Sequence, residues 1–194
     1  MKNKKIIGFV HSLVMLPIMF TGLTNSQIVQ STFVQKVTGQ EAAEVRALEA
    51  ERQIKAEAID TYFAKRDMPL EGMGMNMVIE AEKNDLDWRI LAAIAVREST
   101  GGKHDCKKVD NNAFGWGSCK IGFKSDAEAV ATVARNLGGN NPKTARHYDN
   151  KTTLQILRAY NPPSIVPRYA EQVISIMDAI GDSDLAVVTV VAKS

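Results

Sequence analysis

The segment ILAAIAVRESTGG, from Ile90 to Gly102, limits the possible folds more than any other part of the sequence. Its apolar residues recur at helical spacing and glycines follow it, so it predicts a helix from about Trp88 to Ser99. Glu98 lies seven positions after Leu91 and four after Ile94, which places all three side chains on one helical face. The sequence therefore predicts a core helix with a carboxylate at the end of its apolar face.

The position of Glu98 allows two interpretations. A buried carboxylate without a partner is costly, so Glu98 either forms a surface ion pair with Arg97 or Lys103, or it has a chemical role. Burial and the negative end of the helix dipole both raise its pKa, toward the range in which a carboxyl group holds a proton at neutral pH. Such a carboxyl group is the general acid that cleavage of a glycosidic bond requires.

Helical patterns fill most of the remaining chain, so the expected fold class is mainly α. Strong helix formers occupy residues 41–66, and their apolar positions are sparse before Ile59 and denser after it, which is typical of an exposed stalk helix that ends on a core. Residues 100–124 lack periodicity and predict a long loop or a small hairpin. Further helices are expected at about 75–83, at 125–137 with a capping box of Ser125 and Glu128, at 152–160, and at 167–180 between Pro167 and Gly181.

Cys106 and Cys119 are the only cysteines of the chain. In an oxidising compartment, two cysteines this close in sequence form one disulfide, which would stabilise the fold by roughly 3 kcal/mol. Two buried free thiols are the alternative. A zinc site is not indicated, because only His104 lies nearby and no CxxC or HxxxH spacing occurs. We expect neither a metal ion nor an organic cofactor.

The N-terminus has the pattern of an export segment, because Lys2, Lys4 and Lys5 precede an apolar stretch at residues 6–23. This segment is either a signal peptide cut after Ser26 or a retained membrane anchor, and both place the protein outside the cytoplasm, secreted or on the outer face of the membrane. Without the three lysines, 24 basic residues fall to 21 against 22 acidic ones. Charge therefore gives no support to a nucleic-acid partner.

These patterns divide the chain into four expected segments. They are an export segment at 1–26, a linker and stalk helix at 27–55, a compact helical domain at 56–181, and a tail at 182–194 that is an edge strand or disordered. A chain of 194 residues that is 45% hydrophobic is long enough for one such domain. We expect it to be a monomer.

Four short motifs follow one another along the predicted domain. They are Glu98-Ser99, Asn112-Ala113-Phe114-Gly115, Ala159-Tyr160-Asn161, and YAEQV from Tyr169 to Val173. Together they resemble the lysozyme-like superfamily of peptidoglycan-cleaving enzymes over about residues 78–181. The first two are similar to peptidoglycan N-acetylglucosaminidases of glycoside hydrolase family 73, and the Ala-Tyr-Asn element is similar to lytic transglycosylases. The Gly-Leu-Met-Gln element of transglycosylases is missing from the sequence, which favours hydrolysis.

The resemblance implies a lysozyme-like domain and an exported peptidoglycan glycosidase, of N-acetylglucosaminidase or muramidase type, with Glu98 as general acid and Tyr160 assisting it. The expected partner is the glycan strand of peptidoglycan. A lytic transglycosylase that forms anhydro ends, or a non-catalytic wall-binding module, is the alternative. The substrate-binding residues that the resemblance implies are Ser99, Asn112, Phe114, Trp116, Asn161 and Tyr169.

The sequence leaves the second carboxylate of such an enzyme open. An inverting glycosidase needs a base about 6.5–9.5 Å from the acid, and a retaining one needs a closer nucleophile. Asp105, Asp110 and Asp149 are loop candidates, with Asp110 first. If none approaches Glu98, an acetamido group or a hydroxyl of the substrate has to attack instead, and attack by the hydroxyl is the transglycosylase reaction.

Overall fold

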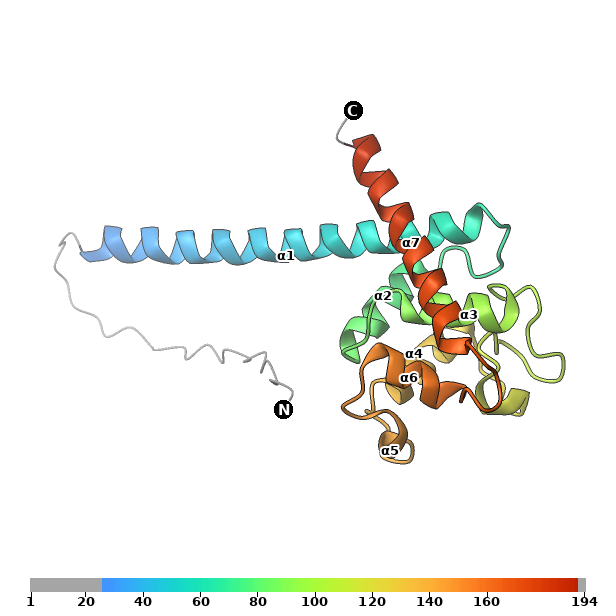
Figure 1. The fold of residues 1–194 in the computed structure, drawn as a ribbon. Coiled ribbons are helices and arrows are strands. Elements are labelled where there is room, and N and C mark those ends of the chain that lie inside the picture. Colours follow the sequence, from blue (N-terminus) through green and yellow to red (C-terminus); the bar gives the residue numbers. More distant parts are fainter. Residues whose placement is uncertain (1–25, 192–194) are drawn as a thin grey trace. The chain divides into compact units, whose positions relative to one another are not determined.

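Helices and loops make up the described part of the protein. A computed structural model describes residues 26–191, together with the side chains of residues 40–182. This range contains no β-strand, which confirms the mainly α class (Figure 1). The elements are α1 (Ser26–Ala64), α2 (Gly74–Lys83), α3 (Ile90–Ser99), the 3-10 helix η1 (Trp116–Cys119), α4 (Asp126–Leu137), α5 (Ala145–Tyr148), α6 (Thr153–Tyr160) and α7 (Tyr169–Val191). Two units, Met1–Leu48 and Glu49–Ser194, divide the chain, and the core lies in the second.

α3 is the central helix of the second unit. Each side chain from Ile90 to Ala95 is fully buried, because α7, α2 and α4 all pack against this helix. α7 crosses α3 in Figure 1 and makes the most extensive contact with it. A helix enclosed on several sides has to be apolar all round, which explains why this segment has no polar face. Burial ends at its last turn, where Glu98 is partly exposed.

Local signals in the sequence set the starts of two other helices. The Ser125 hydroxyl accepts the Glu128 N–H, but the Glu128 carboxylate accepts the N–H of Lys124 rather than that of Ser125, so the expected capping box is incomplete. α6 has the full capping box, in which Thr152 and Gln155 satisfy each other's backbone N–H. The predicted helices at 75–83 and 88–99 correspond to α2 and α3, with starts that differ by one and two residues.

Two expectations about irregular segments are wrong within the described residues. Residues 27–40, expected as a linker, belong to α1, since they contain no proline and only Gly39 weakens the helix. The last helix does not stop before Gly181 but continues to Val191, so most of the expected tail is helical. One glycine costs a helix about 1 kcal/mol, which is not enough by itself to end a helix. Pro167 precedes α7 instead of starting it.

The export segment predicted at 1–26 lies outside the described residues, apart from Ser26. In the range that is described, none of the helices combines the length and the apolar character that crossing a bilayer requires. The interpretation of residues 6–23 as a signal peptide or an anchor stays a prediction.

Candidate functional site

Glu98, in the last turn of α3, is the centre of the candidate site. Its Oε1 accepts a hydrogen bond of 2.6 Å from the hydroxyl of Tyr169, the first residue of α7. Neither cation expected as an ion-pair partner bonds to it: the Lys103 ammonium donates to the Arg66 carbonyl and the Arg97 guanidinium donates to Gln172. Among the described side chains, Glu98 therefore has a neutral hydrogen-bond donor and no salt bridge.

The surroundings of Glu98 favour its protonated form. Burial raises the pKa of the Glu98 carboxyl above its ordinary value, and this effect exceeds the lowering by the Tyr169 hydrogen bond and the Arg97 charge. The pKa of the Tyr169 hydroxyl is raised in turn, first by burial and then by the nearby carboxylate. Tyr169 thus keeps its proton at any physiological pH and remains the donor in this pair. The upward shift expected for Glu98 is confirmed in direction.

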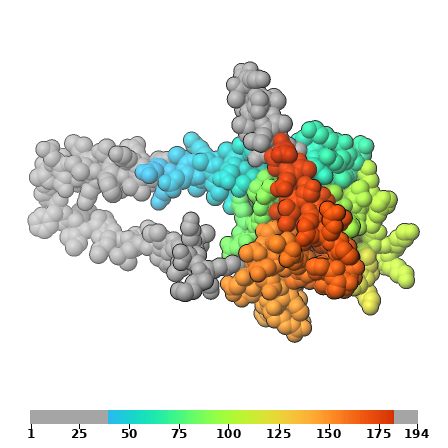
Figure 2. Space-filling view, in the orientation of Figure 1, coloured from blue at the N-terminus to red at the C-terminus, as the bar shows by residue number. Residues whose placement is uncertain are grey.

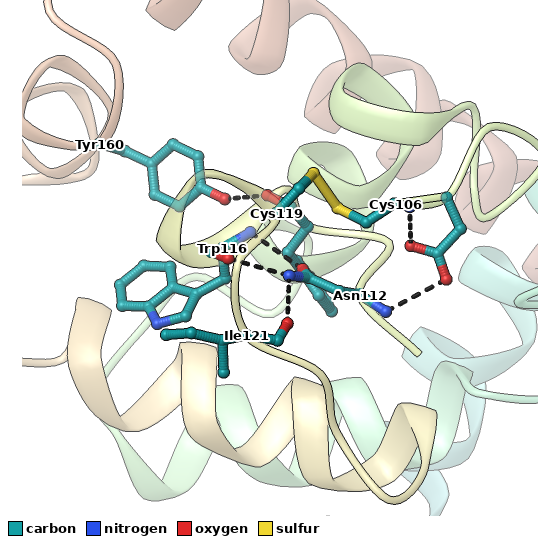
Figure 3. The surroundings of a disulfide bond; sticks show 8 residues. Cys106, Asn112, Trp116, Cys119, Ile121 and Tyr160 are labelled. Carbon is teal, nitrogen blue, oxygen red and sulfur yellow. Dashed lines mark hydrogen bonds between the residues drawn. A yellow bond between two sulfur atoms is a disulfide. The ribbon is translucent and has the colours of Figure 1, made fainter. Parts of the chain in front are cut away.

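Gly115 brings the loop of residues 100–124 against the free oxygen of Glu98. Its φ of 62° lies in the left-handed region, which favours glycine. A Cβ at this position would stand 3.1 Å from Glu98 Oε2, so a residue larger than glycine would crowd that oxygen. The preceding carbonyl, of Phe114, accepts the hydroxyl of Tyr160 (Figure 3). The loop is therefore attached to α6 next to the point where it meets α3.

Asn112 determines the shape of this loop. Its side-chain amide donates to the carbonyls of Trp116 and Ile121 at 2.9 and 2.8 Å, and its Oδ1 accepts the Trp116 N–H at 2.9 Å (Figure 3). Its own backbone N–H donates to Asp105. One fully buried side chain thus replaces the hydrogen bonds that a regular element would supply. The predicted disulfide between Cys106 and Cys119 is confirmed and closes the same loop.

Three aromatic rings form a row beside Glu98. The rings of Tyr160 and Tyr169 are stacked with centroids 5.9 Å apart, and Trp116 tilts against Tyr160 at 5.8 Å. The Arg97 guanidinium lies over Tyr169, at one end of this row, 5.6 Å from the centroid of its ring. Figure 3 shows the rings of Trp116 and Tyr160 on the side of the loop away from Cys106. Both rings are partly exposed, while Tyr169 is only 2% exposed.

Several residues expected to bind substrate have internal roles instead. The Ser99 hydroxyl is buried between the Ala95 carbonyl and the Gly102 N–H, and Asn112 has every polar atom of its side chain occupied within the loop. The ring of Phe114 is 1% exposed and belongs to the core. These three side chains do not line an open surface, because the loop needs them to hold its irregular backbone. Asn161, which follows α6, is partly exposed.

The structure also changes the roles of the two tyrosines. Tyr160 was expected to assist Glu98, but its hydroxyl donates to the Phe114 carbonyl, and Tyr169 is the residue that bonds to the carboxylate. Gly115 and Gln172, which lie within the quoted motifs but were assigned no role from the sequence, complete the surroundings. Gln172 could have been noticed, since it lies three residues after Tyr169 on the same face of a predicted helix.

None of the acidic candidates pairs with Glu98. Asp105 accepts the N–H groups of Cys106 and Asn112, so its carboxylate serves the loop. Across residues 40–182, no other carboxylate is among the groups that shift the Glu98 pKa. The same residues contain no cluster of histidine, cysteine, aspartate and glutamate that could hold a metal ion. Within residues 40–182, Glu98 is therefore the one carboxyl group that these interactions place at the site.

Comparison with known proteins assigns no family. No family model, curated protein or solved structure matches this chain. The resemblance to peptidoglycan-cleaving enzymes rests on the short motifs around Glu98, Phe114, Tyr160 and Tyr169.

Proposed function

We propose that this protein cleaves the glycan strand of peptidoglycan between two amino sugars, with Glu98 as the general acid. The observation that carries the proposal is one half-buried carboxyl group that has a raised pKa and whose second oxygen lies beside Gly115, a position without a side chain. Since Oε1 accepts the Tyr169 hydroxyl, the acidic proton resides on Oε2, next to Gly115. From there it is donated to the bridging oxygen of the glycan as positive charge develops on the sugar ring.

The aromatic row supplies a surface for sugar rings. Trp116 and Tyr160 are both partly exposed, and aromatic rings pack well against the C–H side of a pyranose ring. Asn161, partly exposed at the end of α6, offers an amide for the N-acetyl group of the substrate. The lysozyme-like fold and the peptidoglycan substrate belong to this proposal, which the motifs support.

The nucleophile is supplied by the substrate. In the described part of the chain, no second carboxylate is among the groups that act on Glu98. The neighbouring acetamido group, or a hydroxyl of the same sugar, therefore attacks the anomeric carbon and displaces the leaving sugar. Attack by the acetamido group followed by water gives a reducing end, which is hydrolysis. Attack by the hydroxyl gives an anhydro end, which is the lytic transglycosylase reaction. The single carboxylate favours both routes over a two-carboxylate mechanism.

The proposed location is outside the cytoplasm. The lysine-led apolar segment at the N-terminus supports export, and the disulfide suits an oxidising compartment.

Release of soluble glycan fragments from peptidoglycan tests the proposal. We expect wild type to release fragments and Glu98→Gln to lose at least about 100-fold of that rate, since an amide cannot donate the proton. Glu71→Gln is the matched control, because Glu71 is exposed and distant in sequence from the site. Equal rates for Glu98→Gln and wild type would exclude Glu98 as the acid, and release by neither would favour a non-catalytic wall-binding module. Mass spectrometry separates reducing ends from anhydro ends, which are lighter by one water.

A further inference from the structure

The loop that carries Gly115 is strongly basic. Between residues 103 and 124 the sequence has five lysines, two aspartates and neither arginine nor glutamate, so this stretch carries a net charge of +3 in a chain whose total is +2. The loop forms a projection at one edge of the second unit (Figure 2). Positive charge is therefore concentrated on the loop that contacts Glu98.

The disulfide gathers three of these lysines. Lys107 and Lys108 follow Cys106 directly, and Lys120 follows Cys119. Because the two cysteine Cα atoms are 5.5 Å apart, residues that are distant in sequence share one small region of surface. All three lysines are exposed. We call Lys107, Lys108 and Lys120 the lysine cluster.

The charge of the lysine cluster is not neutralised by its neighbours. Among residues 40–182, none of its ammonium groups has an ion-pair or hydrogen-bond partner. Asp105, the nearest carboxylate in sequence to Lys107, accepts two backbone N–H groups instead. Three like charges held together repel one another and attract an anion.

The cluster is close enough to Glu98 to act on the same ligand. Cys119 lies four positions after Gly115, which contacts Glu98, so their Cα atoms are at most about 14 Å apart. A polymer bound at Glu98 extends over such a distance, whereas a single sugar does not. We propose that the lysine cluster binds carboxylate groups on the polymer that is cleaved at Glu98, and so selects anionic strands over neutral ones. This inference rests on the proposed function.

Binding to one polymer in two charge states tests the inference. The probe is peptidoglycan freed of phosphate-containing polymers, used either with its stem-peptide carboxylates intact or after their conversion to amides. In a Glu98→Gln background, which prevents cleavage, we expect the combined change Lys107→Gln, Lys108→Gln and Lys120→Gln to weaken cosedimentation with the anionic form by about ten-fold. The effect should disappear on the amidated form and at high salt.

A matched triple variant controls for total charge. Lys65→Gln, Lys143→Gln and Lys151→Gln removes the same charge from residues outside the loop and should bind like the parent protein. Equal weakening in this control, or equal weakening on the amidated polymer, would overturn the inference. The inference would also be overturned if the substitutions in the lysine cluster weakened binding only when phosphate-containing polymers are left on the wall.

Cleavage assays with Glu98 intact separate this inference from the proposed function. Failure of the proposed function means that wild type cleaves neither the anionic nor the amidated polymer. Failure of the inference means that wild type is active and that the cluster variant cleaves each of the two polymers as fast as wild type does. Support requires that the variant loses rate on the anionic polymer and keeps it on the amidated one.

Discussion

At the residue scale, Tyr169 controls how readily Glu98 gives up its proton. The sequence predicted a carboxyl group at the end of α3 and an upward pKa shift, and both are confirmed. It could not predict which tyrosine reaches the carboxylate. Tyr160 ends one helix and Tyr169 begins the next, so the choice depends on how α7 crosses α3, which local sequence does not encode.

We expect Tyr169→Phe to raise the pKa of Glu98 further, because the lost hydrogen bond is one of the influences that lower it. The protonated, active form then persists to higher pH, so the alkaline limb of the pH–rate profile moves up. NMR titration of the Glu98 side-chain carboxyl carbon measures the same shift without substrate. A downward shift would show that Tyr169 does not stabilise the carboxylate. Tyr148→Phe, a second buried tyrosine, is the control.

Glu98 should also make the fold more stable in acid than in alkali. Its pKa is raised on folding above the ordinary value of 4.5, so its contribution is fully present below that pH and is lost as pH rises through the folded pKa. Glu98→Gln has no such titration. We expect its free energy of unfolding to exceed that of wild type at neutral pH, with the difference shrinking toward pH 4. Urea unfolding at several pH values measures this trend, and a constant difference would contradict it.

Gly115→Ala should damage both the fold and the activity. The left-handed backbone costs an alanine about 1–2 kcal/mol, and its Cβ would crowd Glu98 Oε2 at 3.1 Å. Gly72→Ala is the matched control, since Gly72 has φ of 86° but open space around its Cα. We expect similar losses in the free energy of unfolding for both variants, and a fall in glycan release of at least about ten-fold for Gly115→Ala alone. Similar activity in both variants would remove Gly115 from the site.

At the scale of elements, periodicity predicted the helices better than the loop. α2, α3, α4 and α6 follow from apolar spacing and capping residues, since those signals are local. The backbone path of the loop at residues 100–124 does not follow from such local signals. Asn112 sets this path through hydrogen bonds to residues four and nine positions away. The resemblance placed Asn112 and Phe114 in the expected substrate site, although the loop buries both.

Asn112→Ala is therefore expected to be among the most damaging loop substitutions. It removes three side-chain hydrogen bonds and takes away these partners from backbone groups of Trp116 and Ile121, which should cost about 3 kcal/mol. Urea unfolding gives the cost, and fluorescence in a Trp88→Phe background reports whether Trp116 has moved. Asn111→Ala loses one hydrogen bond to Phe123 and provides the milder comparison. Equal effects would mean that Asn112 does not organise the loop.

At the scale of the whole molecule, the boundary inside α1 has a testable consequence. The second unit begins at Glu49, and the first buried side chains of α1 follow at Ala56, Ile59 and Phe63. We expect removal of residues 1–48 to change the thermal unfolding midpoint by no more than about 4 °C, because that cut takes nothing from the core.

A longer deletion supplies the contrast. Removing residues 1–67 also takes away Ile59 and Phe63, both fully buried, and should prevent cooperative unfolding altogether. Circular dichroism melts of the two shortened chains, with glycan release from peptidoglycan as a second measurement, separate the outcomes. If the shorter deletion also abolished the transition, the part of α1 before Glu49 would be required by the core. That result would be incompatible with the division into two units, and it would extend the compact domain to the N-terminal part of the helix.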